Sequence, residues 1–180
     1  MRADARRNRD QLVAQARTVF AESGADGSLD EIARRAGVAS GTLYRHFPTR
    51  IDLIQVVLAE QLAELVGLGR RLLDEDDAFT ALAEWLAAIL QHGLTYRGLT
   101  AAVMNSALDS RNELVAHWHQ ELFEVGDALL GRAQRAGVVV EARTDDVLRL
   151  VSAVAWASQD DDDPARAERL LGHILTGLRR

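Results

Sequence analysis

The segment from Ser40 to His46 gathers hydroxyl, phenol, guanidinium and imidazole groups within about two helical turns. Leu43 and Phe47 lie one helical turn apart in this stretch, which predicts a short helix with an apolar face turned inward. The groups left on the outward face are polar and rich in hydrogen-bond donors. Such a face suits hydrogen bonding to base edges and phosphates.

The composition excludes several kinds of catalysis. The chain has 0 cysteines, which excludes thiolate nucleophiles, disulfides, Cys-ligated zinc and thiol redox switches. All 21 basic side chains other than histidine are arginines, which excludes Schiff-base and lysine-nucleophile chemistry. The sequence contains no GxSxG, HExxH or phosphate-cradling loop. We therefore predict that the protein is not an enzyme and needs no cofactor.

Two alternatives stay open at this point. The first is a small helical metal-dependent hydrolase that uses His92, His119 and acidic residues. The pair His117 and His119 gives it no support, because residues two apart on a helix point about 200° apart and cannot ligate one ion together. We predict no metal site. The second alternative is a helical module that docks on a protein, against which a steep loss of DNA affinity with added salt would argue.

The elements that position the polar segment follow from periodicity and turn residues. Apolar residues at helical spacing predict an amphipathic helix from about residue 5 to 23, ended by Gly24. Ser28 and Glu31 have the spacing of a capping box, so a second helix begins there and ends at Gly37. The polar segment forms the third, very short helix. A helix, a tight glycine turn and a short helix outline a helix-turn-helix.

This outline resembles the N-terminal domain of TetR-family transcriptional regulators over roughly residues 8 to 60. The resemblance rests on ESGADGSLDEIARRAGVASGTLYRHFPTRIDLIQVVL, which includes Ala36-Gly37-Val38 and the run from Gly41 to Phe47. Ser28 stands where the family more often has threonine, and Arg50 where it usually has lysine. The resemblance implies an all-α protein of about nine helices. Its expected domains are a helix-turn-helix DNA-binding domain at residues 1–50 and an effector-binding and dimerisation domain at residues 51–180.

The resemblance also implies DNA contacts for individual residues. Thr42, Tyr44 and His46, at alternate positions of the third helix, match family positions that commonly bind the DNA backbone. Ser28 and Arg50 match positions that lie at phosphates. Arg45 is placed to read both acceptors of a guanine. The implied DNA-binding residues are Ser28, Ser40, Gly41, Thr42, Tyr44, Arg45, His46 and Arg50.

The arginines near the N-terminus have two interpretations. They form either a flexible arm near the minor groove or a solvated, disordered tail. The residues concerned are Arg2, Arg6, Arg7 and Arg9.

The C-terminal part is expected to dimerise, because one short reading helix discriminates poorly among DNA sites. Two heads about 34–36 Å apart would read a palindromic operator. Apolar stripes on the last two predicted helices, residues 145–158 and 164–178, are the candidates for this interface. Part of each stripe also packs within one chain. The predicted interface residues are Val147, Val151, Val154, Ser158, Leu170, Leu171, Ile174 and Leu178.

The predicted central helix, from Phe79 to Tyr96, carries a stripe of side chains with apolar bodies and some polar tips. An apolar wall with a few directional groups suits a small, partly hydrophobic effector. A plain aromatic core is the alternative. The residues predicted to line the effector site are Trp85, Ile89, His92 and Tyr96 on the stripe, with Met104, Trp118, His119 and Phe123 from neighbouring helices.

Charge and hydropathy favour a soluble, intracellular DNA-binding protein. The net charge is −6, yet residues 1–50 hold 9 arginines against 6 acidic residues, whereas the remainder holds 12 against 21. The basic head is therefore the part expected to meet a polyanion. No stretch approaches the ~20 apolar residues that a membrane span needs, so we predict no membrane contact and a cytoplasmic location. The resemblance to the TetR family implies a repressor that binds a palindromic double-stranded DNA operator as a homodimer and is released by a small, partly hydrophobic effector.

Overall fold

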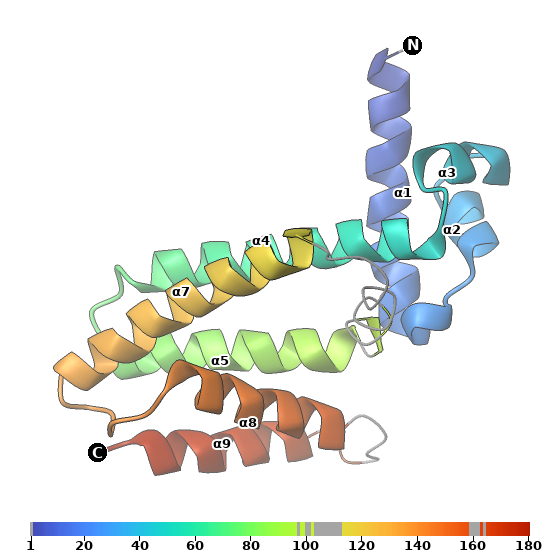
Figure 1. The fold of residues 1–180 in the computed structure, drawn as a ribbon. Coiled ribbons are helices and arrows are strands. Elements are labelled where there is room, and N and C mark those ends of the chain that lie inside the picture. Colours follow the sequence, from blue (N-terminus) through green and yellow to red (C-terminus); the bar gives the residue numbers. More distant parts are fainter. Residues whose placement is uncertain (1, 97, 100–101, 103–112, 159–162, 164) are drawn as a thin grey trace. The chain divides into compact units, whose positions relative to one another are not determined.

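The computed structural model describes residues 2–96, 98–99, 102, 113–158, 163 and 165–180. These ranges form eight α-helices and a short 3-10 turn, without any strand beyond an isolated bridge between Val139 and Arg179 (Figure 1). The expected all-α fold is therefore confirmed. None of these helices combines the length and apolar character that a bilayer crossing requires. The sequence also predicts a short helical segment from Leu99 to Leu108, and most of this segment lies outside the described residues.

The chain divides into two compact units, Met1–Glu60 with Thr95–Asn112 and Gln61–Leu94 with Glu113–Arg180. Each unit is described below by itself, and the domain boundary expected at residue 50 stays a prediction. The elements are α1 (Arg2–Ser23), η1 (Gly24–Asp26), α2 (Leu29–Arg35), α3 (Ser40–His46), α4 (Arg50–Leu72), α5 (Ala78–Thr95), α7 (Glu113–Arg135), α8 (Thr144–Ala157) and α9 (Arg166–Leu178).

In the first unit, α1 packs against α2 and α3, and α2 packs against α3. Phe20 of α1, Ile32 of α2 and Leu43 of α3 are all buried, as their helical spacing predicts. Gly37 ends α2 with φ +69°, a conformation in which a side chain is strained. The amide of Val38 then donates to the carbonyl of Ala33 at 3.0 Å, which turns the chain sharply into α3. This is the turn of the predicted helix-turn-helix.

Short polar residues cap several helix N-termini. At α4 the cap is reciprocal, because Thr49 Oγ1 accepts from the Asp52 amide at 3.2 Å and Asp52 Oδ2 accepts from the Thr49 amide at 2.8 Å. At α2, Ser28 Oγ accepts from the Glu31 amide at 3.3 Å. The capping box expected there is only half formed, because two arginines of α2 bind the Glu31 carboxylate instead.

In the second unit, one hydrophobic core joins buried residues of α4, α5, α7, α8 and α9. At its centre lies Trp85 of α5, which is 1% exposed and donates from Nε1 to the Leu65 carbonyl at 3.0 Å. The predicted central, buried helix is thus present as α5. The last helix begins at Arg166, later than expected, although Asp163 Oδ1 still accepts from the amide of Ala165 at 3.0 Å.

Candidate nucleic-acid interface

Helix α3 presents a polar outer surface because its apolar residues are used for anchoring. Leu43 and Phe47 are only 1% and 2% exposed, so they fix the helix to the first unit. Ser40, Gly41 and Arg45 are exposed, and the Tyr44 side chain is 49% exposed. The remaining two predicted contact residues of this helix, Thr42 and His46, are half-buried.

Arg45 lies folded along its own helix. Its Nε donates to the Gly41 carbonyl at 3.1 Å, and its Nη2 donates to Thr42 Oγ1 at 3.0 Å. A guanidinium carries five N–H donors in a planar fork, so these two bonds leave further donors on the same group. To reach a base edge with both arms of the fork, Arg45 must exchange at least one of these intrahelical bonds for the base.

Ser40 is tied to helix α2. Its hydroxyl donates to Asp30 Oδ1 at 2.8 Å, and both side chains are exposed. No sequence pattern predicted a part for Asp30, which reads as an ordinary acidic residue in the first turn of a helix. The turn at Gly37 brings the two residues together, so only the geometry of the turn could have predicted the contact.

Arg50 bridges the start of α4 to the turn before α2. Its Nη1 donates to the Ala25 carbonyl at 3.0 Å and to the Gly27 carbonyl as well. These bonds hold the chain immediately before Ser28, so Arg50 and Ser28 lie at the same end of α2. The expected contact between Arg50 and a phosphate stays a prediction. It would use N–H groups of the guanidinium other than those bonded to the Ala25 and Gly27 carbonyls.

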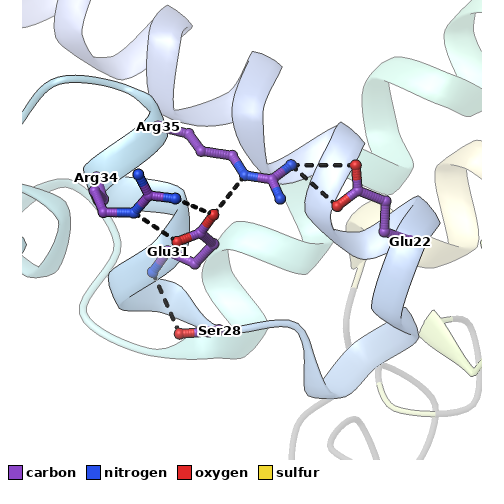
Figure 2. A network of polar contacts seen from close by, with 5 residues as sticks. All are labelled: Glu22, Ser28, Glu31, Arg34 and Arg35. Carbon is purple, nitrogen blue, oxygen red and sulfur yellow. Dashed lines mark hydrogen bonds and ion pairs between the residues drawn. The ribbon is translucent and has the colours of Figure 1, made fainter.

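A charge network fastens α2 to α1 (Figure 2). The Glu31 carboxylate accepts from Arg34 Nε at 2.7 Å and from Arg35 Nε at 2.7 Å, and Arg35 Nη1 reaches Glu22 of α1 at 3.0 Å. Hydrogen bonds from Arg34 and then Arg35 lower the pKa of Glu31 to about 2, so the carboxylate stays charged at any ordinary pH. No sequence pattern predicted this network, which links α2, the helix that Ser28 caps and that contains Asp30, to α1.

The N-terminal arginines belong to a helix in this structure. Helix α1 begins at Arg2, so Arg6, Arg7 and Arg9 lie within it. The expectation of a flexible arm or a disordered tail is therefore wrong. The Arg9 guanidinium lies 5.6 Å from the centre of the Phe47 ring, within cation–π range. This contact joins the first helix to the end of α3.

Apart from His92, the residues predicted to line an effector site fall into three groups. Trp85 belongs to the buried core of the second unit, and Ile89 and Phe123 pack against that core. Tyr96 belongs to the first unit, where it lines a groove of about 520 Å³ with residues of α1. Met104 and the side chains of Trp118 and His119 lie outside the described residues.

His92, the remaining residue of this set, is half-buried near the end of α5. Burial lowers the pKa of its imidazole to about 4, and this outweighs the negative charge of the Glu64 carboxylate, which raises the pKa. The imidazole is therefore neutral at pH 7, as a hydrogen-bonding group beside an apolar core should be.

We expect His92 to make the second unit less stable as the pH falls from 6.5 to 4. In this window the unfolded chain binds a proton that the folded chain does not, so the free energy of unfolding decreases by at most about 3 kcal/mol. Urea denaturation at pH 7, 5.5 and 4.5 measures the slope. His92→Gln should flatten it, whereas His173→Gln, on the exposed face of α9, should not. A slope equal to wild type in His92→Gln would contradict the assignment.

The predicted interface residues of α8 and α9 are mostly occupied within the single chain. Val147, Val151, Leu171 and Leu178 belong to the buried core of the second unit. Val154 and Ile174 pack against that core, and Ser158 and Leu170 are half-buried. Different residues of α8 are exposed instead, with Leu150 at 54% and Trp156 at 75%.

Comparisons with known proteins agree with this architecture over nearly the whole chain. Residues 12–57 match the family described as bacterial regulatory proteins, tetR family, and residues 77–180 match the transcriptional regulator SbtR-like C-terminal domain. An HTH-type transcriptional regulator of Staphylococcus aureus is 28% identical over 97% of this chain and 94% of its own.

Solved structures extend the agreement to three dimensions. A TetR transcriptional regulator from Streptomyces coelicolor is similar with a TM-score of 0.76 and 35% identity, covering 95% of this chain and 98% of that one. A TetR regulatory protein from Mycobacterium vanbaalenii matches with a TM-score of 0.68 and 28% identity, over 99% of both chains. With its buried anchors, glycine turn and polar third helix, the chain belongs to the TetR family of helix-turn-helix transcriptional regulators.

Proposed function

We propose that this regulator is a repressor that binds a palindromic DNA operator as a homodimer and releases it when a small, partly hydrophobic effector binds. The observation that carries the proposal is α3, whose apolar residues anchor it while its hydroxyl, phenol and guanidinium groups face outward. A face with this composition suits the major groove, where base edges present donors and acceptors between two rows of phosphates.

Gly41 supports the placement of α3 against DNA. A Cβ added at this exposed position would meet no protein atom within 4 Å, so packing within the described part of the protein does not require glycine. Glycine also weakens a helix relative to alanine. A residue without a side chain at this point allows the helix backbone to approach base edges closely.

Within this proposal, the residues of the head have distinct roles. Arg45 reads a base edge beside Ser40 and Gly41, after it exchanges its bond to the Gly41 carbonyl for one to the base. Thr42, Tyr44 and His46 hold phosphates on either side of the groove. Ser28 and Arg50 meet the backbone at the other end of α2, where they already lie together.

The test begins with selection from a pool of randomised DNA duplexes by the wild-type protein. Arg45→Ala and Tyr44→Ala should each weaken binding to the selected duplex by about tenfold or more at fixed salt, because each loses a contact worth about 1–3 kcal/mol. Arg71→Ala is the control for Arg45→Ala. It removes one positive charge from the exposed surface of α4 and should change DNA affinity less than twofold. Unchanged affinity in both head variants would remove these assignments.

The homodimer is supported by the outer face of α8 and α9. Leu150 and Trp156 are exposed apolar side chains on α8. On α9, a Cβ added at Gly172 or Gly177 would meet no atom within 4 Å, so a second helix can approach the backbone there. In the proposed homodimer the second subunit covers these exposed apolar side chains, which removes their apolar area from water.

The effector site is proposed for the second unit. A groove of about 520 Å³ lies between α7 and the start of α8, with Phe123 and Leu130 as apolar walls and Asp127 and Gln134 as polar groups. Such a lining suits a ligand that is partly hydrophobic and carries a few hydrogen-bonding groups. The effector acts by binding more tightly to the form of the dimer that does not fit the operator. The proposed place of action is the cytoplasm.

A further inference from the structure

The two hydroxyl groups of α3 have hydrogen-bond partners of opposite kinds. Ser40 Oγ lies 2.8 Å from Asp30 Oδ1, whereas Thr42 Oγ1 lies 3.0 Å from Arg45 Nη2. Both contacts involve exposed or half-exposed side chains at the surface that the proposed function places against DNA.

Each partner fixes what the hydroxyl can still offer. An ionised carboxylate only accepts hydrogen bonds, so the single proton of Ser40 is committed to Asp30 and only lone pairs remain. A guanidinium only donates, so Thr42 accepts from Arg45 and keeps its own proton for another acceptor. Ser40 is thereby prepared as an acceptor and Thr42 as a donor, although the two residues carry the same chemical group.

We propose that Asp30 is a specificity-determining residue, because it makes Ser40 an acceptor that selects a base with an amino group in the major groove. Only cytosine, through N4, and adenine, through N6, present a donor there, whereas guanine and thymine present acceptors. Thr42 with its free proton is matched to a phosphate oxygen instead. This inference rests on the proposed function, since it assumes that α3 enters the groove.

Electrostatics support the same assignment of Ser40. The Asp30 carboxylate carries a negative charge within hydrogen-bonding distance of Ser40 Oγ. A phosphate bound to this hydroxyl would face that charge at short range, which is unfavourable, whereas an amino group of a base would not. The charge thus directs Ser40 away from the DNA backbone and toward the base edges.

The experiment compares base preferences, which a purely structural defect would not change. The wild-type protein, Ser40→Ala and Asp30→Ala are each used to select duplexes from one randomised pool. Asp26→Ala is the matched control, because it removes one exposed carboxylate of the head outside the Ser40 contact. Because Asp30 and Ser40 are exposed, both variants should fold, and thermal denaturation verifies it.

We expect one operator position at which the wild type prefers cytosine or adenine by about tenfold, the effect of one net hydrogen bond. This preference should disappear in Ser40→Ala and in Asp30→Ala, and the double variant should lose nothing further. Replacing that base by its analogue without the amino group, pyrimidin-2-one or purine, should weaken wild-type binding about tenfold and Ser40→Ala binding less than twofold.

Two outcomes would overturn the inference. If the wild type selects a duplex but Asp30→Ala keeps every base preference of the wild type, Asp30 does not set specificity, and the proposed function is untouched. If the wild type selects no duplex at all, the proposed function fails and this inference fails with it.

Discussion

Replacing Gly69 with alanine is expected to destabilise the second unit by about 2 kcal/mol, although alanine favours a helix. A Cβ at this position of α4 would lie 2.2 Å from Val125 Cγ1 and 2.8 Å from Trp85 Nε1. Neither neighbour can move freely, because Val125 and Trp85 are 5% and 1% exposed in the same core. The clash must therefore displace packed side chains, at a cost that exceeds the gain in helix propensity.

Gly67 provides the matched control on the same helix. A Cβ there would meet only Arg71 Nη1, the end of a flexible side chain, at 3.6 Å. Gly67→Ala should therefore stabilise the protein by about 0.5–1 kcal/mol. Urea denaturation followed by circular dichroism measures both variants. Equal stability of the two variants would show that α4 does not pack on Trp85 as described.

The same packing has a consequence for the proposed release of DNA. Helix α4 begins at Arg50, whose guanidinium holds the turn before Ser28, and its other end carries Gly69 against Trp85. Because Trp85 also donates to the Leu65 carbonyl of α4, that part of the helix cannot shift without moving the indole. Within the proposed function, an effector that displaces Trp85 would therefore also move the part of α4 that carries Leu65 and Gly69.

Local patterns predicted the elements of the head well. The short polar helix, the glycine turn and the Ser28 cap of α2 depend on residues a few positions apart, so sequence spacing is enough to recognise them. Periodicity also identified which side of α3 is buried, because Leu43 and Phe47 recur one turn apart.

Contacts between distant residues could not be predicted in the same way. The spacing of the stripe from Trp85 to Tyr96 indicated that these residues share one face of a helix. It did not indicate which residues of other helices pack against that face. Trp85 is buried because the two glycines Gly69 and Gly126 leave room for its ring; a Cβ at Gly126 would lie 3.0 Å from Cη2. Glycines within the predicted helices were the sequence signal that could have indicated this close packing around Trp85. No sequence signal pointed to Asp30, because its contact with Ser40 depends on the angle between α2 and α3 at the Gly37 turn.

Introducing arginine at both Leu150 and Trp156 is expected to convert the proposed dimer into monomers. The change places two like charges on each subunit at a self-complementary face, where they would also be desolvated. Binding to a full palindromic duplex should then weaken by about 100-fold or more. In the dimer the second head binds its half-site intramolecularly once the first is bound, and a monomer loses this advantage. Sedimentation velocity at micromolar concentration and titration of the selected duplex measure the two effects.

The folded subunit itself should be unaffected, since both side chains are exposed and contribute little to its core. Ala136→Arg, at an exposed position after α7, adds a charge away from this face and should leave both mass and affinity unchanged. Binding to a duplex with a single half-site separates assembly from recognition, because a monomer with an intact α3 should bind it as well as the wild type does. A double variant that keeps the wild-type mass and full operator affinity would exclude α8 as the interface, and the second head would have to be joined through another surface.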